Sequence, residues 1–232
     1  MTTPPPPLPA AVLWDMDGTL IDTEPYWMAE EGELIAEAGG AWTREDAEEL
    51  VGNDLIRSAE IILARTPVTG TPEEVVDRLL MGVVARTRAH LPWRPGAQEL
   101  LQECVDAEVP CALVTMSWEP LADVLLESLP AGTFSAVVTG DQVTHGKPAP
   151  EPYLLAAERL GVQPVDCVAL EDSGTGVRSA VAAGVPTVGI PHVVPIPDLA
   201  GLVRVPTLQG VTLQDLAGLA AGVRASAAAE VR

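Results

Sequence analysis

The prediction of the fold starts from one segment, Ala10-Ala11-Val12-Leu13-Trp14-Asp15-Met16-Asp17-Gly18-Thr19. This segment starts as a short apolar run and stops abruptly at Asp15, as a buried parallel strand does when it delivers a side chain to a site. Taken alone, an Asp-x-Asp pair is usually a turn or a helix cap. The rest of the sequence has to show whether this strand belongs to a parallel sheet.

Beyond residue 96, apolar runs alternate with helical segments. Further strands are predicted at residues 111–114, 136–138, 167–170 and 187–190, with a weaker one near 202–205. Helices are predicted at residues 97–106, 119–128, 151–160 and 174–183, and a last one from about Leu213, capped by Thr212. Alternation of this kind predicts an α/β fold, a parallel sheet with helices on both faces.

Residues 24–91 differ in texture from the segments on either side. They are rich in Glu, Ala, Leu and Arg with helical spacing, for example at Leu50, Ile56, Ala59 and Leu63. Thr71 followed by Glu74 predicts a capping box, with Pro72 at the first helical position. We therefore expect an all-helical insert between the two core segments, residues 10–23 and 92–232. The Pro-rich residues 1–9 predict an extended, disordered tail.

The composition excludes several kinds of partner. The 232 residues carry a formal net charge of −20, which disfavours binding to nucleic acid or anionic membranes. The longest stretch without Asp, Glu, Lys or Arg, residues 179–197, contains four prolines and does not resemble a membrane helix. The N-terminus has no pattern of a secretory signal, so we expect a cytoplasmic protein. The expected oligomeric state is a monomer or a weak dimer. Cys104, Cys111 and Cys167 lack metal-ligand spacing and are interpreted as buried free thiols.

Polar residues end several of the predicted strands. Asp15 and Asp17 follow the first strand, Thr115 follows the second, and Glu171-Asp172 ends another; Lys147 lies in a loop after residues 136–138. In a parallel α/β sheet, ligands bind beyond the carboxyl ends of the strands. Four distant parts of the chain thus bring chemically useful groups to one edge of one sheet. Thr115 and Glu171-Asp172 could each instead be helix N-caps.

The residue types indicate phosphoryl transfer. Asp15 is a candidate nucleophile that takes up a phosphoryl group, and Asp17 can protonate the leaving oxygen and later deprotonate a water. Gly18 permits the tight turn that brings backbone N–H groups to the phosphate. Asp15 and Asp172, together with Glu171, offer the hard oxygen ligands that suit Mg²⁺.

A hydroxyl and an ammonium group complete the phosphate site. Thr115 offers its hydroxyl to a phosphate oxygen, and Lys147 supplies a compact positive charge. Lys147 is the only lysine among 13 basic residues, the other 12 being arginines. An ammonium group on a flexible stem is not interchangeable with a planar guanidinium at a crowded site, so the solitary lysine favours a functional role.

Four segments resemble the haloacid dehalogenase-like hydrolases, in the branch of phosphoglycolate phosphatase and β-phosphoglucomutase. These segments are residues 15–25, 113–117, 146–153 and 170–176. The resemblance implies a Rossmann-like core with an inserted helical cap, and a mechanism through an aspartyl phosphate. It also implies the following roles: Asp15 as nucleophile, Asp17 as acid and base, Gly18, Thr115, Met116 and Lys147 at the phosphate, and Asp15, the Asp17 carbonyl, Glu171 and Asp172 at Mg²⁺.

Within this family the residues favour a phosphatase acting on a small phosphorylated metabolite, of sugar or polyol type. Asp17 is the residue that haloacid dehalogenases lack, and an insert without lysine excludes the Schiff base of phosphonoacetaldehyde hydrolases. Two alternatives stay open: a sugar phosphomutase of the β-phosphoglucomutase type, and a non-catalytic protein that binds a phosphometabolite. The residues expected near the leaving group are Glu24, Trp27, Asn53, Arg57 and Ser117.

Overall fold

The predicted strands assemble into one parallel sheet. The computed structural model describes residues 5–230, and the strand order in it is β3-β2-β1-β4-β5-β6, all neighbours being parallel. The strands are β1 (Val12–Trp14), β2 (Cys111–Val114), β3 (Ala136–Val138), β4 (Val168–Glu171), β5 (Thr187–Gly189) and β6 (Leu202–Arg204). The α/β fold class is confirmed.

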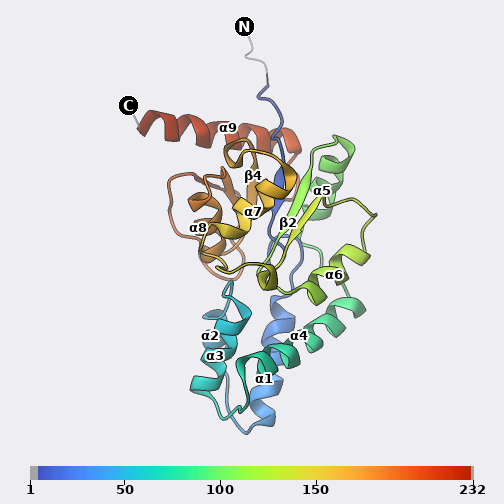
Figure 1. Cartoon of the computed structure of the whole chain (residues 1–232), viewed down its shortest axis with the longest axis vertical. Helices are drawn as coiled ribbons and strands as arrows, with labels where there is room; N and C mark the ends of the chain where they lie inside the picture. The colour runs from blue at the N-terminus through green and yellow to red at the C-terminus, as the bar shows by residue number, and fades with distance from the viewer. Residues whose placement is uncertain (1–4, 231–232) are drawn as a thin grey trace.

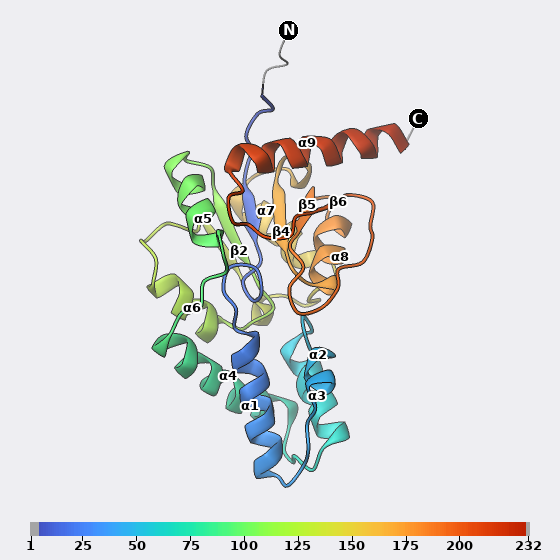
Figure 2. The ribbon, with the colours of Figure 1, turned by 180° about the vertical axis from the view of Figure 1, so that it is seen from behind.

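Helices cover both faces of this sheet (Figures 1 and 2). They are α5 (Ala97–Asp106), α6 (Glu119–Glu127), α7 (Glu151–Leu160), α8 (Gly174–Ala182) and α9 (Leu213–Glu230), with single 3₁₀ turns at Gly140–Gln142 and Pro164–Asp166. Side chains alternate across the sheet, so Trp14 packs into the same apolar cluster as α5 and α9, and Leu13 into the cluster with α7 and α8. Burial on both faces explains why β1 is apolar throughout.

The segment between β1 and α5 folds as four helices. These are α1 (Glu24–Glu37), α2 (Arg44–Glu48), α3 (Leu55–Arg65) and α4 (Pro72–Ala89), and they form a separate layer beyond the carboxyl ends of the strands (Figure 1). The capping box is present as predicted, with the Thr71 hydroxyl accepting a bond from the Glu74 N–H and Pro72 at the first helical position. The insert is joined to the core where the Asp22 N–H donates to the Pro92 carbonyl.

A buried carboxylate ties α1 to α4 inside the insert. Glu30 is 4% exposed and accepts bonds from Arg78 at 3.1 Å and from Arg86 at 2.7 Å. Gly82 makes room for it, since a Cβ on this residue would lie 1.8 Å from Glu30 Oε2. The helical layer is therefore held by ion pairs as well as by apolar contacts.

Other expectations concern the cysteines and the N-terminus. Cys104, Cys111 and Cys167 are buried free thiols, as predicted. Residues 5–9 of the expected tail have no regular secondary structure, and residues 1–4 lie outside the described part of the chain. Over residues 5–230, no helix is both long enough and apolar enough to cross a membrane.

Candidate active site

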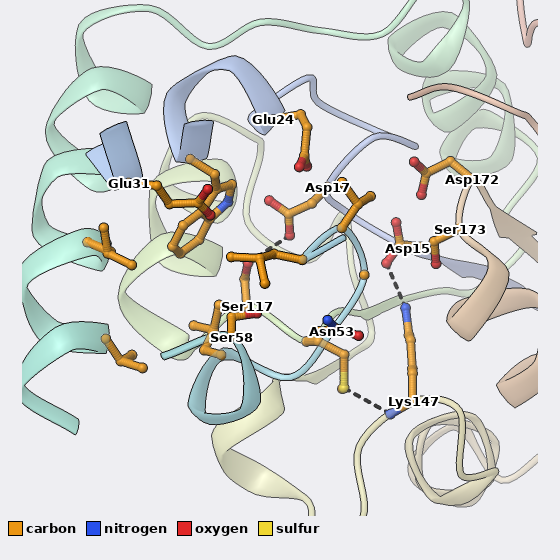
Figure 3. Close-up of a pocket in the computed structure, with 18 residues that line it drawn as sticks. Asp15, Asp17, Glu24, Glu31, Asn53, Ser58, Ser117, Lys147, Asp172 and Ser173 are labelled. Atoms are coloured by element: carbon orange, nitrogen blue, oxygen red, sulfur yellow. Dashed lines mark hydrogen bonds and ion pairs between the residues drawn. The ribbon is translucent and has the colours of Figure 1, made fainter. Parts of the chain in front are cut away.

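A pocket lies between the carboxyl edge of the sheet and the helical insert (Figure 3). Its core end is lined by Asp15 and Asp17 after β1, Met116 and Ser117 after β2, Lys147 before α7, and Asp172 and Ser173 before α8. Its insert end is lined by Glu24, Trp27, Glu31, Leu50, Val51, Gly52, Asn53, Leu55, Ser58, Val76 and Leu79. The structure thus brings together most of the residues that the sequence singled out.

Lys147 is the centre of the core end. Its Nζ donates to Asp15 Oδ1 at 2.6 Å, to Glu171 Oε1 at 2.6 Å and to the Val114 carbonyl at 2.9 Å. The side chain is 3% exposed, and its Nζ lies 5.3 Å from the ring centroid of Tyr153. All three ammonium hydrogens are therefore used, and the buried charge is compensated by two carboxylates.

Burial and neighbouring charges shift the pKa values of Lys147, Asp15 and Asp172. Burial lowers the pKa of Lys147, but the carboxylates of Asp15 and Glu171 outweigh it, so the net shift is upward and the ammonium stays charged. Burial raises the pKa of Asp15 to about 8; Glu171 and Asp17 add to the rise, and Lys147 opposes it. Burial also raises the pKa of Asp172 well above its ordinary value, with repulsion from Asp15, Glu171 and Glu24 adding to the effect.

Three carboxyl groups could hold a divalent cation. Ligand atoms of Asp15, Glu171 and Asp172 all lie within 4.8 Å of one another. Asp15 Oδ2 is buried and has no hydrogen-bond partner within residues 5–230, as expected of an atom that faces a cation. Glu171, in contrast, accepts bonds from Lys147 and from Tyr153 through Oε1, so it also holds Lys147 in place.

The Gly18 turn packs tightly against this cluster. Gly18 has φ +86°, and a Cβ built on it would lie 2.0 Å from Asp172 Oδ2. Its N–H donates to the Ile21 carbonyl, so it closes the turn instead of facing the pocket. The N–H groups of Asp17 and Met116 have no hydrogen-bond partner among residues 5–230. Glycine at this position lets Asp172 approach the loop.

Asp17 is held by three hydroxyl groups. Thr23 donates to its Oδ1 at 2.5 Å, and Thr115 and Ser117 donate to its Oδ2 at 3.0 and 2.8 Å. Thr115 is fully buried and does not line the pocket. The sequence pointed to Thr115 and Ser117, but no role was assigned to Thr23, which follows Asp17 by six residues within the segment 15–25.

Both helix-cap alternatives are wrong. Helix α6 begins at Glu119, with Trp118 at the N-cap position, so Thr115 caps no helix. Helix α8 is capped by Ser173, whose hydroxyl accepts a bond from the Gly176 N–H at 3.0 Å. Glu171 and Asp172 therefore remain available for the site.

The insert end contains most, but not all, of the residues expected there. Glu24, Trp27 and Asn53 line the pocket, whereas Arg57 does not. Arg57 lies on the outer face of α3 and pairs with Glu60 at 3.0 Å, its side chain 65% exposed. Leu55 and Ser58 line the pocket and are three residues apart, so the helical period turns Arg57 away.

Glu31 is the main residue that the sequence analysis missed. It is 5% exposed, lines the pocket, and accepts a bond from Trp42 Nε1 at 3.1 Å through Oε2. Burial raises its pKa to about 7, with the Trp42 bond opposing the shift. Burial likewise raises the pKa of Glu24 to about 8, and repulsion from Asp17, Glu31 and Asp22 adds to this. The spacing of Glu24, Trp27 and Glu31 places them on one helix face and could have revealed Glu31.

Comparison with known proteins agrees with this geometry. The family model described as haloacid dehalogenase-like hydrolase matches residues 9–184. Hexitol phosphatase B of Escherichia coli (strain K12) is 30% identical over 218 residues, covering 90% of this chain and 96% of its own length. The fructose-1-phosphate phosphatase YqaB of the same organism is 31% identical over 182 residues, covering 78% and 96%.

A solved structure extends the likeness to three dimensions. It is that of CbbY from Rhodobacter sphaeroides in complex with xylulose-(1,5)bisphosphate. This structure superposes with a TM-score of 0.82 at 28% identity and covers 90% of this chain and 99% of that one. The likeness therefore includes the helical insert as well as the sheet.

Proposed function

The chain belongs to the haloacid dehalogenase-like hydrolases, and we propose that it is a Mg²⁺-dependent phosphatase acting on monophosphate esters of sugars or polyols. Support comes from relatives that are phosphatases of phosphorylated carbohydrates and from the core end of the pocket. One observation carries the proposal: Lys147 holds one oxygen of the buried Asp15 carboxylate, while the other oxygen has no partner in the described part of the chain. A carboxylate that is fixed through one oxygen and free at the other suits nucleophilic attack.

The proposed reaction has two steps. Asp15 attacks the phosphorus atom, a bond from its carboxylate oxygen to phosphorus forms, and the bond from phosphorus to the ester oxygen breaks. Asp17 gives its proton to the departing alkoxide, which leaves as an alcohol. Asp17 then takes a proton from a water molecule that attacks the aspartyl phosphate, releasing inorganic phosphate and restoring Asp15. The hydroxyls of Thr23, Thr115 and Ser117 orient Asp17 for both transfers.

The surrounding groups of the core end offset negative charge. The Lys147 ammonium lies beside Asp15, and the free N–H groups of Asp17 and Met116 can donate to phosphate oxygens. Asp15 and Asp172 would hold Mg²⁺, which neutralises charge on the phosphate so that an anionic nucleophile can approach it. Glu171 would act mainly through Lys147, which it holds at 2.6 Å.

The four helices of the insert would serve as the cap. They bring apolar side chains, including Trp27, Leu55 and Leu79, to the side of the pocket opposite the sheet. The insert touches the core where the Thr175 hydroxyl donates to the Gly52 carbonyl at 2.7 Å. A cap held in this way excludes bulk water from the reacting phosphate, so that the aspartyl phosphate meets only the water that Asp17 activates.

Phosphate release from a panel of esters tests the proposal. The panel contains p-nitrophenyl phosphate and hexitol and ketose monophosphates, assayed with and without Mg²⁺. We expect turnover that requires Mg²⁺ and that Asp15→Asn reduces by a factor of about 10⁴ or more. Asp141→Asn, which removes an exposed carboxylate from the core, is the matched control. Absence of turnover on every ester, or full activity of Asp15→Asn, would contradict the proposal.

A further inference from the structure

The two ends of the pocket differ in the charge that they present. At the core end, the Lys147 ammonium lines the pocket beside the Asp15 carboxyl group and places a positive charge there. At the insert end, the charged side chains that line the pocket are Glu24 and Glu31, both acidic. A phosphate group would find the Lys147 charge, and Mg²⁺ in the function proposed above, at the first end. At the second end, the only charged groups in the lining are carboxyl groups.

The arginines of the insert do not change this balance. Within residues 24–91 there are six, and each one pairs with a glutamate outside the pocket lining: Arg44 with Glu48, Arg57 with Glu60, Arg65 with Glu49, Arg78 with Glu30 and Glu37, Arg86 with Glu30 and Glu33, and Arg88 with Glu127. None of the six lines the pocket. Within residues 5–230, an anion at the insert end would therefore find no cationic side chain there.

Glu31 is placed to contact the far part of a substrate. It lies seven residues after Glu24 on α1, which is about 10 Å along the helix axis. In Figure 3 it lies on the opposite side of the pocket from Lys147 and Asp172. Trp42 fixes its Oε2, and among the described residues no hydrogen bond involves Oε1. One oxygen of an almost fully buried carboxyl group is thus left free to bind a hydroxyl.

Resting on the phosphatase function proposed above, we infer that Glu31 is a specificity-determining residue. Together with Glu24, it restricts the enzyme to esters whose leaving alcohol is an uncharged polyol, and it rejects leaving groups that carry a second phosphate or a carboxylate. Hydroxyl groups can donate to Glu31 and to the polar side chains of Asn53 and Ser58, which line the same end. An anion there would be desolvated beside carboxyl groups without compensation.

A pair of substrates with the same carbon chain tests the inference. Glucitol 6-phosphate and 6-phosphogluconate differ in that a terminal CH₂OH of the first is a carboxylate in the second. Because burial raises the pKa of Glu31 to about 7, the assays are run at pH 8.5, where this group is ionised. We expect the wild-type kcat/KM for glucitol 6-phosphate to exceed that for 6-phosphogluconate by about 30-fold or more.

The variant Glu31→Gln removes the charge and keeps the shape. It should reduce the ratio of the two kcat/KM values by about fivefold or more, because 6-phosphogluconate gains relative to glucitol 6-phosphate. Glu37→Gln is the matched control: it removes the same charge from the same helix, at a side chain that is 65% exposed and outside the pocket. The ratio should stay at the wild-type value in this control.

The outcomes separate this inference from the proposed function. Absence of p-nitrophenyl phosphate turnover by the wild-type protein with Mg²⁺ would remove the phosphatase function and this inference with it. Suppose that the wild-type protein hydrolyses p-nitrophenyl phosphate, but that its kcat/KM for 6-phosphogluconate equals that for glucitol 6-phosphate. In that case only the inference fails. That comparison needs no variant, so it decides the matter even if Glu31→Gln does not fold. An unchanged ratio in folded Glu31→Gln would also overturn the role of Glu31.

Discussion

The two ends of the pocket are built differently. At the core end, Lys147 and Asp17 each make three hydrogen bonds to groups from several parts of the chain. At the insert end, apolar side chains surround Glu31 and Ser58, and the Glu31 carboxyl group has one hydrogen-bond partner among the described residues, Trp42. Dense bonding fixes the atoms that must react, whereas sparse bonding leaves polar atoms free for a ligand. The core end thus suits chemistry, and the insert end suits recognition.

Removal of the Lys147 charge would disrupt the core end most strongly. In metal-free protein, Lys147→Met leaves Asp15 and Glu171 buried without a counter-ion, so we expect a loss of about 3–5 kcal/mol in the free energy of unfolding. Phosphatase turnover should fall by a factor of about 10³. Urea unfolding and phosphate release measure the two effects.

The control for this variant is Arg178→Met, which removes an exposed cation from α8 close to the same site. It should change the free energy of unfolding by less than about 0.5 kcal/mol. If Lys147→Met were as stable and active as this control, the Lys147 charge would be needed neither for the stability of the core end nor for turnover.

Metal removal exposes the repulsion among the core carboxyl groups. In metal-free protein, burial raises the pKa of Asp15 to about 8 and that of Asp172 well above its ordinary value. Such groups bind protons more tightly in the folded than in the unfolded chain. The free energy of unfolding of EDTA-treated protein should therefore fall between about pH 4 and pH 8, by up to about 1.4 kcal/mol per pH unit for each group.

Saturating Mg²⁺ should replace the protons bound to Asp15 and Asp172 and raise Tm. It should also weaken the dependence of the free energy of unfolding on pH. Thermal melts across this pH range, with EDTA or Mg²⁺, measure the difference. Asp172→Asn should abolish the effect of Mg²⁺, and Asp141→Asn, an exposed carboxylate, should leave it unchanged. The same slope in EDTA and in Mg²⁺ would mean that the cluster holds no cation.

A pair of glycines tests how the insert is held together. Gly82→Ala places a Cβ 1.8 Å from the buried Glu30 carboxylate, so we expect a destabilisation of about 1–3 kcal/mol. Gly32→Ala, in α1, has open space and should stabilise by about 0.5–1 kcal/mol, as alanine does in a helix interior. Urea melts of both variants measure the contrast, and equal stability changes would contradict the role of Glu30.

Loss of the hydrogen bond between Thr175 in the core and Gly52 in the insert should have the smallest effect of these changes. Thr175→Val removes the hydroxyl that donates to Gly52, so the insert should close less firmly and KM should rise by about fivefold. Thr133→Val removes a comparable bond, to the Pro130 carbonyl, on the exposed surface and is the control. Steady-state kinetics compares them, and KM values that match would indicate that this contact does not hold the insert closed.

The core was largely predictable because its signals are local. The apolar runs at residues 111–114 and 136–138 coincide with β2 and β3, and the predicted helices at 97–106 and 151–160 coincide with α5 and α7. A strand that is buried on both faces needs a continuous apolar run, which is visible without knowledge of its neighbours. The sheet also brings Asp15, Lys147 and Asp172 to one edge, so topology alone places them together.

The insert end was less predictable because its geometry depends on packing between helices. Arg57 was expected near the leaving group, but Asp54 caps α3 and sets a helical phase that turns Arg57 outward. Glu31 was missed because a glutamate in a Glu-rich segment normally faces solvent. Its burial follows from α1 packing against α4 and from the bond to Trp42, neither of which is local in sequence.

A search for the covalent intermediate tests the proposed role of Asp15 most directly. Wild-type protein turning over p-nitrophenyl phosphate with Mg²⁺ is quenched in acid, digested and analysed by mass spectrometry. We expect a phosphoryl group on the peptide that contains Asp15, absent from Asp15→Asn and present in the Asp141→Asn control. Turnover without any phosphoryl group on that peptide, or with one on a different residue, would contradict the proposed role of Asp15.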